Sequence, residues 1–253
     1  MEMPWDLSPP EMAHVVHRII RKETGVSDPY RGVKRESNTL ALEFYPEAKK
    51  KVESSDDPLL TALKISVAGN IMDFGAMESF NLEETVEKVL ESEFRIDHSS
   101  RLISEIKGTR SMAVVLDNAG EIVFDRLLVE TAKQANPSLE KVLWVVKGGP
   151  ILNDAMMEDA KAAGLDRIEG VESSFFEVSN GDPATGPERS SPEFVQELKK
   201  WGVVISKGQG NYEAMSEYPG IYFVLMAKCP VVADDIGVEV GDLVVWKSGE
   251  REG

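Results

Sequence analysis

The stretch VVLDNAGEIVFD, residues 114–125, decides the fold. It begins with an apolar run, residues 114–116, that is typical of a buried strand. Asp117 and Asn118 follow at once, and after a short polar turn the pattern becomes that of an apolar helix. An acid and an amide therefore stand at the end of a buried strand, where an unpaired polar side chain is costly unless it binds something.

The alternation of strand and helix continues through the rest of the sequence. Short β-branched or aromatic runs recur from about residue 111, several of them separated by helical stretches; they are MAVVLD, KVLWVVK, FFEVS, GVVIS, IYFVLMAK and DLVVWK. Apolar runs that are continuous rather than alternating are typical of parallel strands covered on both faces. We therefore expect an α/β fold with a doubly wound, mainly parallel sheet and helices on both faces.

The first hundred residues have a helical pattern instead. Three amphipathic stretches begin at a capping residue followed by proline, namely Ser8-Pro9, Asp28-Pro29 and Asp57-Pro58, and further amphipathic stretches cover about 82–95 and 99–107. We expect an all-helical N-terminal portion, residues 1–108, that packs on an α/β catalytic domain, residues 109–253.

Composition limits the classes of function. The 253 residues carry a net charge of −16, which argues against a nucleic-acid or anionic-membrane partner. The single cysteine, Cys229, excludes an internal disulfide framework. No secretory leader or membrane-length apolar run is present, so a cytoplasmic location is expected. The sequence does not indicate the oligomeric state.

Polar side chains gather at the predicted strand ends, where ligands bind in doubly wound sheets. They are Asp117, Asn118, Glu121, Lys147, Asn153, Asp154, Asn180, Asp182, Lys207, Asn211 and Lys228. Asp117, Asn118 and Asp154 offer only hard oxygen ligands, which suit Mg²⁺ or Mn²⁺. Each residue also has a simpler interpretation, since an Asp or Asn before a helix is often a cap and a lysine after a strand is often only solvated.

Several segments together resemble the metal-dependent damage-control phosphatases, long catalogued as domain of unknown function eighty-nine. The segments are DNAGEIVFDRLL, VKGGPILNDAMMEDA, VSNGDPATG, SKGQGNYEAMSE and AKCPVVADDIGV, with DPYRGVKRESN and AGNIMDFG in the helical part. The resemblance implies one divalent metal, bound by Asp117, Asn118 and Asp154. It also implies hydrolysis of small phosphorylated metabolites, such as sugar phosphates or damaged cofactor intermediates, with manganese, cobalt, nickel or magnesium.

Charge suggests roles for the other residues. The transferring phosphoryl group needs positive charge, which the metal, the helix amides after Gly120, and Lys207 or Lys147 could supply. We assign catalytic roles to Asp117, Lys207 and Asp182. The predicted substrate-binding residues are Asn70, Asp73, Glu121, Lys147, Asn153, Asn180, Asn211 and Lys228. The nucleophile is either a metal-bound water or a carboxylate.

Two other classes of function fit parts of the pattern. An acid after a strand beside glycine-containing loops is compatible with an S-adenosylmethionine-dependent methyltransferase. Such enzymes commonly have a Gly-x-Gly loop after the first strand of the sheet, and Asp117-Asn118 stands there instead. A binding module without catalysis is the third interpretation.

Overall fold

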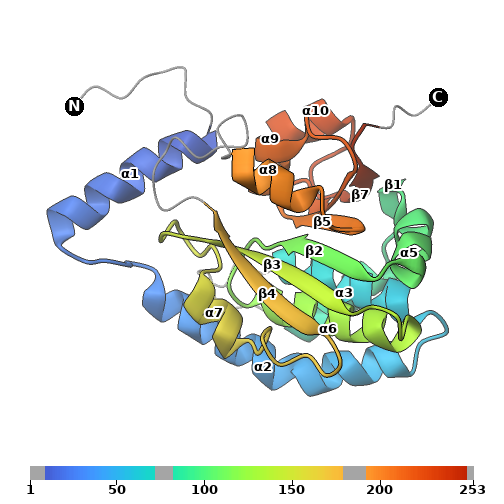
Figure 1. Cartoon of the computed structure of the whole chain (residues 1–253). Coiled ribbons are helices and arrows are strands. Elements are labelled where there is room, and N and C mark those ends of the chain that lie inside the picture. The colour runs from blue at the N-terminus through green and yellow to red at the C-terminus, as the bar shows by residue number, and fades with distance from the viewer. Residues whose placement is uncertain (1–8, 72–81, 179–191, 250–253) are drawn as a thin grey trace.

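The computed structural model describes residues 9–71, 82–178 and 192–249. Within these residues seven strands form one sheet; they are β1 (Phe94–Asp97), β2 (Ser111–Val115), β3 (Lys141–Lys147), β4 (Glu172–Val178), β5 (Val203–Lys207), β6 (Ile221–Met226) and β7 (Leu243–Lys247). Their order across the sheet is β1-β7-β6-β5-β2-β3-β4 (Figure 1). Every neighbouring pair is parallel except β6 and β7. The predicted mainly parallel sheet is confirmed.

The direction of winding reverses between β2 and β5, which lie side by side in the middle of the sheet. From β2 the chain proceeds outward through β3 to β4, and from β5 it proceeds the other way through β6. The loops that follow β2 and β5 therefore leave the sheet on opposite faces and open a crevice between them. Asp117 comes directly after β2, so this crevice is the natural place for a ligand.

Helices cover both faces of the sheet. The described helices are α1 (Pro9–Thr24), α2 (Arg31–Glu53), α3 (Pro58–Ile71), α4 (Leu82–Glu91), α5 (Ser99–Gly108), α6 (Glu121–Ala135), α7 (Met157–Ala162), α8 (Pro192–Leu198), α9 (Gln209–Met215) and α10 (Pro230–Ile236). In Figure 1, α3 and α6 lie against one face with α2 outside them, and α8, α9 and α10 lie over the other. The predicted doubly wound α/β architecture is confirmed.

A short strand interrupts the N-terminal helical portion. The helices predicted there are present, and the cap predicted at Asp57 forms, since its Oδ1 accepts from the amide of Leu60 at 3.1 Å. Between α4 and α5, however, β1 pairs in parallel with β7. The helical portion therefore contributes an edge strand to the sheet of the second predicted domain.

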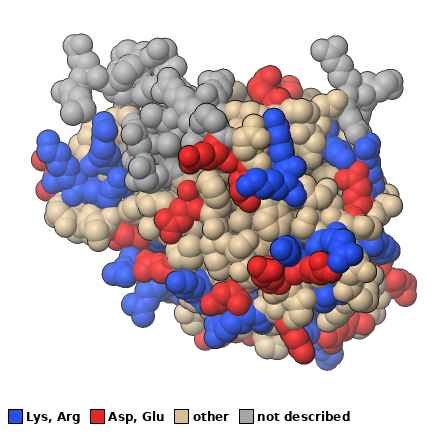
Figure 2. All heavy atoms as spheres, in the orientation of Figure 1, with Lys and Arg blue, Asp and Glu red and all other residues tan. Residues whose placement is uncertain are grey.

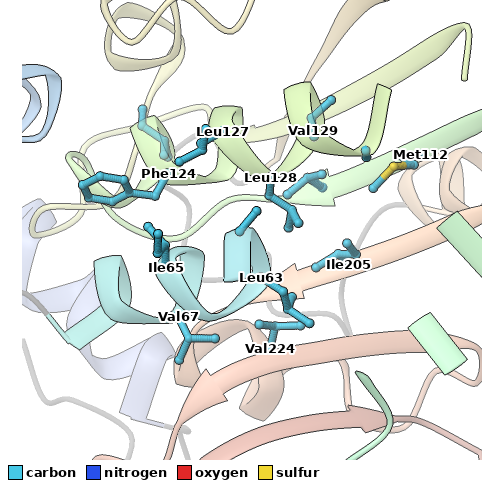
Figure 3. Packing of buried hydrophobic residues seen from close by; sticks show 14 of the residues in the cluster. Leu63, Ile65, Val67, Met112, Phe124, Leu127, Leu128, Val129, Ile205 and Val224 are labelled. Carbon is cyan, nitrogen blue, oxygen red and sulfur yellow. The ribbon is translucent and has the colours of Figure 1, made fainter. Parts of the chain in front are cut away.

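The larger core cluster lies between the sheet and helices α3 and α6. Its side chains interlock between the two helices and strands β2, β5 and β6, as Figure 3 shows for Leu63, Ile65, Val67, Met112, Phe124, Leu127, Leu128, Val129, Ile205 and Val224. Helices α3 and α6 come close because Gly69 has no side chain. A Cβ atom there would lie 3.0 Å from Phe124 Cδ2 and 3.1 Å from Glu121 Cα.

Charges of both signs are mixed on the visible surface. In Figure 2, Lys and Arg side chains lie among Asp and Glu side chains, with one basic group over α1. No helix in the described ranges is long and apolar enough to cross a membrane.

Phe124 tests the contact between the helical portion and the sheet. Its side chain is fully buried and packs edge-on against Phe44 of α2. Phe124→Ala should lower the free energy of unfolding by about 3–5 kcal/mol, because a large cavity remains in the core. Urea unfolding measures the change, with the exposed Val240→Ala as the control, expected within about 0.5 kcal/mol of wild type. Equal losses in the two variants would contradict this packing.

Candidate active site

Two short backbone segments pair at the carboxyl end of the sheet. Residues 117–119 follow β2 and residues 153–155 lie in the loop after β3. The amide of Ala119 donates to the carbonyl of Asn153 at 2.9 Å, and Asn118 forms an antiparallel bridge with Asp154. The pairing brings together the three residues that were predicted from the sequence as metal ligands, although they come from different loops.

Asn118 has a defined orientation in this group. Its Nδ2 donates to Asp117 Oδ2 at 2.8 Å and to Glu121 Oε2 at 3.3 Å. Its amide oxygen accepts no hydrogen bond from any residue in the described part of the chain. The oxygen is therefore the atom of this amide that remains available to a ligand.

Asp154 does not act as a helix cap. The helix after it, α7, has Met156 at its N-cap position, and the amide of Met156 donates to Asp159 Oδ2 at 3.0 Å. Asp154 instead has Lys147 nearby, with Nζ 3.7 Å from Oδ2. The capping interpretation of Asp154 is wrong for this structure, because Asp159 satisfies the end of α7.

The folded protein disfavours the ionised form of both carboxyl groups, although lysines lie near them. Burial, Glu121 and Asp154 together raise the pKa of Asp117 to about 8, against the opposing effect of Lys228 and Lys147. Burial also raises the pKa of Asp154, which Lys147 and Lys34 partly oppose. A bound cation would reverse both shifts, because it favours the ionised carboxylates.

Lys147 is held at the edge of this group by Asn211. Its Nζ donates to Asn211 Oδ1 at 3.1 Å. Asn211 is buried, and its Nδ2 donates to the carbonyls of Leu116 and Lys207 at 2.9 and 2.8 Å. Asn211 thus joins the ends of β2 and β5 and fixes the lysine beside Asp154. The structure brings both residues to the site, as predicted.

Lys207 lies beneath the site and is fully buried. Its Nζ donates to Glu121 Oε1 and Asp125 Oδ1, both at 2.7 Å, and to the carbonyl of Ser66 at 3.0 Å. Burial alone would lower the pKa of Lys207, but Asp125 and Glu121 raise it above its usual range. All three ammonium protons have acceptors, so the geometry favours an indirect role over the phosphoryl contact predicted from the sequence.

Gly208 allows the end of β5 to approach the end of β2. Its φ is +79°, which favours glycine, and a Cβ atom there would lie 1.8 Å from Asp117 Oδ2. The carboxylate of Asp117 therefore occupies the space that any other residue at position 208 would fill.

Residues of the helical portion complete the site, and sequence analysis missed them. Asn38 of α2 accepts from the amide of Gly120 at 2.7 Å and donates to Asp159 Oδ1 at 2.9 Å. Lys34, one turn earlier, is fully buried, with Nζ 2.8 Å from Asp28 Oδ2 and 3.4 Å from Asp159 Oδ2. Their spacing of four residues in RGVKRESN was a signal for one shared helix face.

The remaining predicted residues make backbone hydrogen bonds or have no described side chain. The amide of Lys228 donates to Gln209 Oε1 at 3.0 Å, and Asn153 contributes its backbone carbonyl to the paired segments. Asn70 lies in α3, but nothing is described of its side chain, and Asp73, Asn180 and Asp182 lie outside the described residues. Their predicted roles stay predictions.

The ligands available suit a hard divalent cation. In the described ranges no three side chains of His, Cys, Asp or Glu form a metal-binding group. The candidate set is instead Asp117 and Asp154 with the amide oxygen of Asn118. Few protein ligands, all oxygen, are typical of Mg²⁺ or Mn²⁺ sites in which water and phosphate complete the coordination.

A pocket of about 310 Å³ lies beside this group. Lys147, Gly148 and Met156 form its wall toward the paired segments, and its charged residues also include Asp28, Arg31, Glu158 and Glu177. The lining comes from the turn before α2 and its first residue, the end of β3 and the loop after it, the start of α7 and the end of β4.

Known proteins resemble this chain over nearly its whole length. The profile described as the damage-control phosphatase ARMT1-like domain matches residues 1–244. An uncharacterized protein of Methanocaldococcus jannaschii is 39% identical over 94% of this chain and 80% of its own length. A damage-control phosphatase of Archaeoglobus fulgidus is also 39% identical, over 94% of this chain and 83% of its own. The crystal structure of a DUF89 family protein of Pyrococcus horikoshii superimposes with a TM-score of 0.80 at 32% identity, covering 93% of this chain and 80% of that one.

Asp117 should give the metal-free protein a defined dependence of stability on pH. Its ordinary pKa is 3.8 and its folded pKa is about 8. Between these values the folded protein keeps a proton that the unfolded chain has released, so this residue reduces stability as the pH rises from about 4 to 8. Asp117→Asn removes the effect. In EDTA, the melting temperature of the variant minus that of wild type should therefore increase as the pH rises from about 4 to 8.

Thermal unfolding at constant ionic strength measures the difference between the two proteins. Asp234→Asn, an exposed aspartate of α10, is the matched control for the substitution itself. A difference between wild type and Asp117→Asn that stays constant with pH would show that Asp117 does not carry the effect.

Proposed function

This chain belongs to the damage-control phosphatase family with the ARMT1-like domain, and from that premise we propose that it is a divalent-metal-dependent phosphomonoester hydrolase of small phosphorylated metabolites. The observation that carries the proposal is the convergence of Asp117, Asn118 and Asp154 at the switch point of the sheet. The same three residues match the metal ligands that the family resemblance implies.

Asp117, Asp154 and the oxygen of Asn118 would hold the cation, which we propose to be Mn²⁺, Co²⁺, Ni²⁺ or Mg²⁺. The raised pKa values of the two carboxyl groups support this, because they indicate that the nearby lysines do not offset burial and the neighbouring acids when no cation is bound. Such a cation supplies charge to the phosphoryl oxygens and activates water for hydrolysis.

The chain's own cations would guide the phosphate. Lys147 is fixed by Asn211 beside Asp154, and Lys228 acts on Asp117 from the loop after β6. The helix amides expected to help are partly engaged already, since Gly120 donates to Asn38 and Ile122 donates to the carbonyl of Asn118. We therefore assign the stabilising charge mainly to Lys147 and Lys228.

The pocket beside Lys147 has a mixed lining. It combines apolar residues such as Met156 and Met157 with Glu177 and the Arg31–Glu158 pair, and these charged groups could bind a hydroxyl of a sugar phosphate or the polar part of a damaged cofactor intermediate. Its volume of about 310 Å³ is at the small end of ligand sites. We propose that the part of the substrate remote from the phosphate binds there.

The methyltransferase alternative is not supported. The chain and its matched relatives belong to a phosphatase family. In addition, the loop after the central strand β2 places Asp117 and Asn118 where a dinucleotide or methyl-donor site would need glycines.

The first test is phosphate release. The purified protein with Mn²⁺ should release phosphate from small phosphate esters, including sugar phosphates, and EDTA should abolish the release. A colorimetric phosphate assay across a panel of phosphorylated metabolites measures the rate and ranks the substrates. Asp117→Asn serves as the control for contaminating phosphatases, and equal rates in Mn²⁺ and EDTA would contradict metal dependence.

The second test uses stability to examine Asp154. A cation that binds only the folded protein at one hundred times its dissociation constant stabilises it by about 2.7 kcal/mol, which raises the melting temperature. Asp154→Ala should lose most of that rise. In EDTA it should melt no lower than wild type, because the folded protein disfavours the charge of Asp154.

Four melting curves test whether Asp154 is a metal ligand. Wild type and Asp154→Ala are each melted in EDTA and in Mn²⁺. The exposed Asp166→Ala is the control and should keep the full metal-induced rise. An Asp154→Ala variant that keeps the rise would remove Asp154 from the ligand set.

A further inference from the structure

We propose that Glu121 selects the orientation of the Asn118 amide, so that its oxygen faces the cation, and that Lys207 holds Glu121 in place for this purpose. Glu121 and Lys207 would thus be positioning residues of the metal site rather than groups that contact the substrate. The inference rests on the proposed metal-dependent function, because it concerns the ligand that Asn118 supplies.

The need for such a device follows from the chemistry of an amide. An asparagine side chain can turn over about its last bond, which exchanges its oxygen with its NH₂ group. The oxygen binds a cation and the NH₂ group does not. A site that uses asparagine as a ligand therefore works only if its surroundings favour one of the two orientations.

Acceptors on one side of Asn118 provide this preference. Nδ2 donates to Asp117 Oδ2 at 2.8 Å and to Glu121 Oε2 at 3.3 Å, and the backbone amide of Asn118 also donates to Glu121 Oε2 at 3.4 Å. Asp117 is itself one of the proposed ligands of the cation. Glu121 is the acceptor from outside the ligand set that keeps the NH₂ group turned away from the cation.

Glu121 can do this because its own orientation is fixed. It is fully buried, its Oε1 accepts from Lys207 Nζ at 2.7 Å, and its Oε2 faces Asn118. Gly69 of α3 packs against the same side chain, where an added Cβ atom would lie 3.2 Å from Glu121 Cγ. Oε1 therefore accepts from Lys207 and Oε2 from two nitrogens of Asn118, and the side chain has little room to move.

Lys207 is anchored independently of Glu121. Its Nζ also donates to Asp125 Oδ1 at 2.7 Å and to the carbonyl of Ser66 at 3.0 Å. Asp125 receives a further hydrogen bond of 2.6 Å from the Ser66 hydroxyl, and the described donors of Asn118 reach Asp117 and Glu121 rather than Asp125. Asp125 therefore shares the lysine with Glu121 but lies outside the contact that orients the amide.

A glutamine at position 121 would break the arrangement without changing its shape. It offers one acceptor oxygen to two donors, Lys207 and Asn118. The charged donor forms the stronger hydrogen bond and keeps the oxygen. The NH₂ group of the glutamine then faces Nδ2 of Asn118, and the Asn118 amide turns over to present its oxygen there instead of to the cation.

Calorimetric titration of the metal-free protein with Mn²⁺ tests this. Glu121→Gln should weaken Mn²⁺ binding by roughly 10–100-fold, the range usual for partners that orient a metal ligand. Asp125→Asn is the matched control, since it neutralises the other carboxylate on the same lysine, and its dissociation constant should stay within about threefold of wild type. Urea unfolding of each protein reports any general loss of stability.

An Asn118→Asp background separates orientation from general damage. A carboxylate presents an oxygen to the cation whichever way it is turned, and Glu121 would then face it as a like charge, so adding Glu121→Gln to Asn118→Asp should no longer weaken Mn²⁺ binding. If Glu121→Gln does not fold, Glu121→Asp replaces it. The shorter carboxylate cannot reach both Lys207 and Asn118, and at least a tenfold weakening is expected.

The outcomes are distinguishable from failure of the proposed function. Wild-type protein that does not bind Mn²⁺ would overturn the metal-dependent function itself. Wild type that binds Mn²⁺ while Glu121→Gln binds it equally well would overturn only the orienting role. Equal weakening in Glu121→Gln and Asp125→Asn, or a penalty that persists in the Asn118→Asp background, would also overturn it.

Discussion

One buried ammonium group joins three separate parts of the chain. Lys207 ends β5, its two carboxylate partners project from α6, and its third acceptor is a backbone carbonyl of α3. A buried lysine is strongly unfavourable unless it is paired and its protons have acceptors. The sheet, α6 and the helical portion must therefore close together around this charge, and the proposed metal ligands lie at the edge of the sheet beside it.

Much of the site could be predicted because the order and direction of the strands bring its residues to one edge of the sheet. The carboxyl ends of parallel strands meet at one edge, so Asp117, Asn118 and Asp154 could be placed together from the pattern of apolar runs. The role of Lys207 could not, because its position after an apolar strand is equally typical of a solvated lysine. The missing signal was Glu121 and Asp125, two acids one turn apart that flank the apolar run IVF at the start of the helix. Such a pair indicates a buried cation.

The contribution of the helical portion was harder to predict. Asn38 contacts Gly120 and Asp159 at sequence separations of 82 and 121 residues, and no local pattern specifies such partners. The short strand β1, FRID, has the apolar–charged alternation of a strand, but over only four positions, and it overlaps the stretch 82–95 that was interpreted as an amphipathic helix. Its conformation comes from pairing with β7, which is a tertiary effect.

That edge of the sheet also sets the order in which the protein can fold. The amide of Lys247 donates to His98 Nδ1 across 149 residues of sequence, beside the pairing of β1 with β7. Contacts of such long range form late, because a large loop must first close. During synthesis β1 leaves the ribosome long before β7, so it waits for its partner strand. A chain cut before Leu243 would leave β6 as an open sheet edge, which is a surface prone to pairing with other chains.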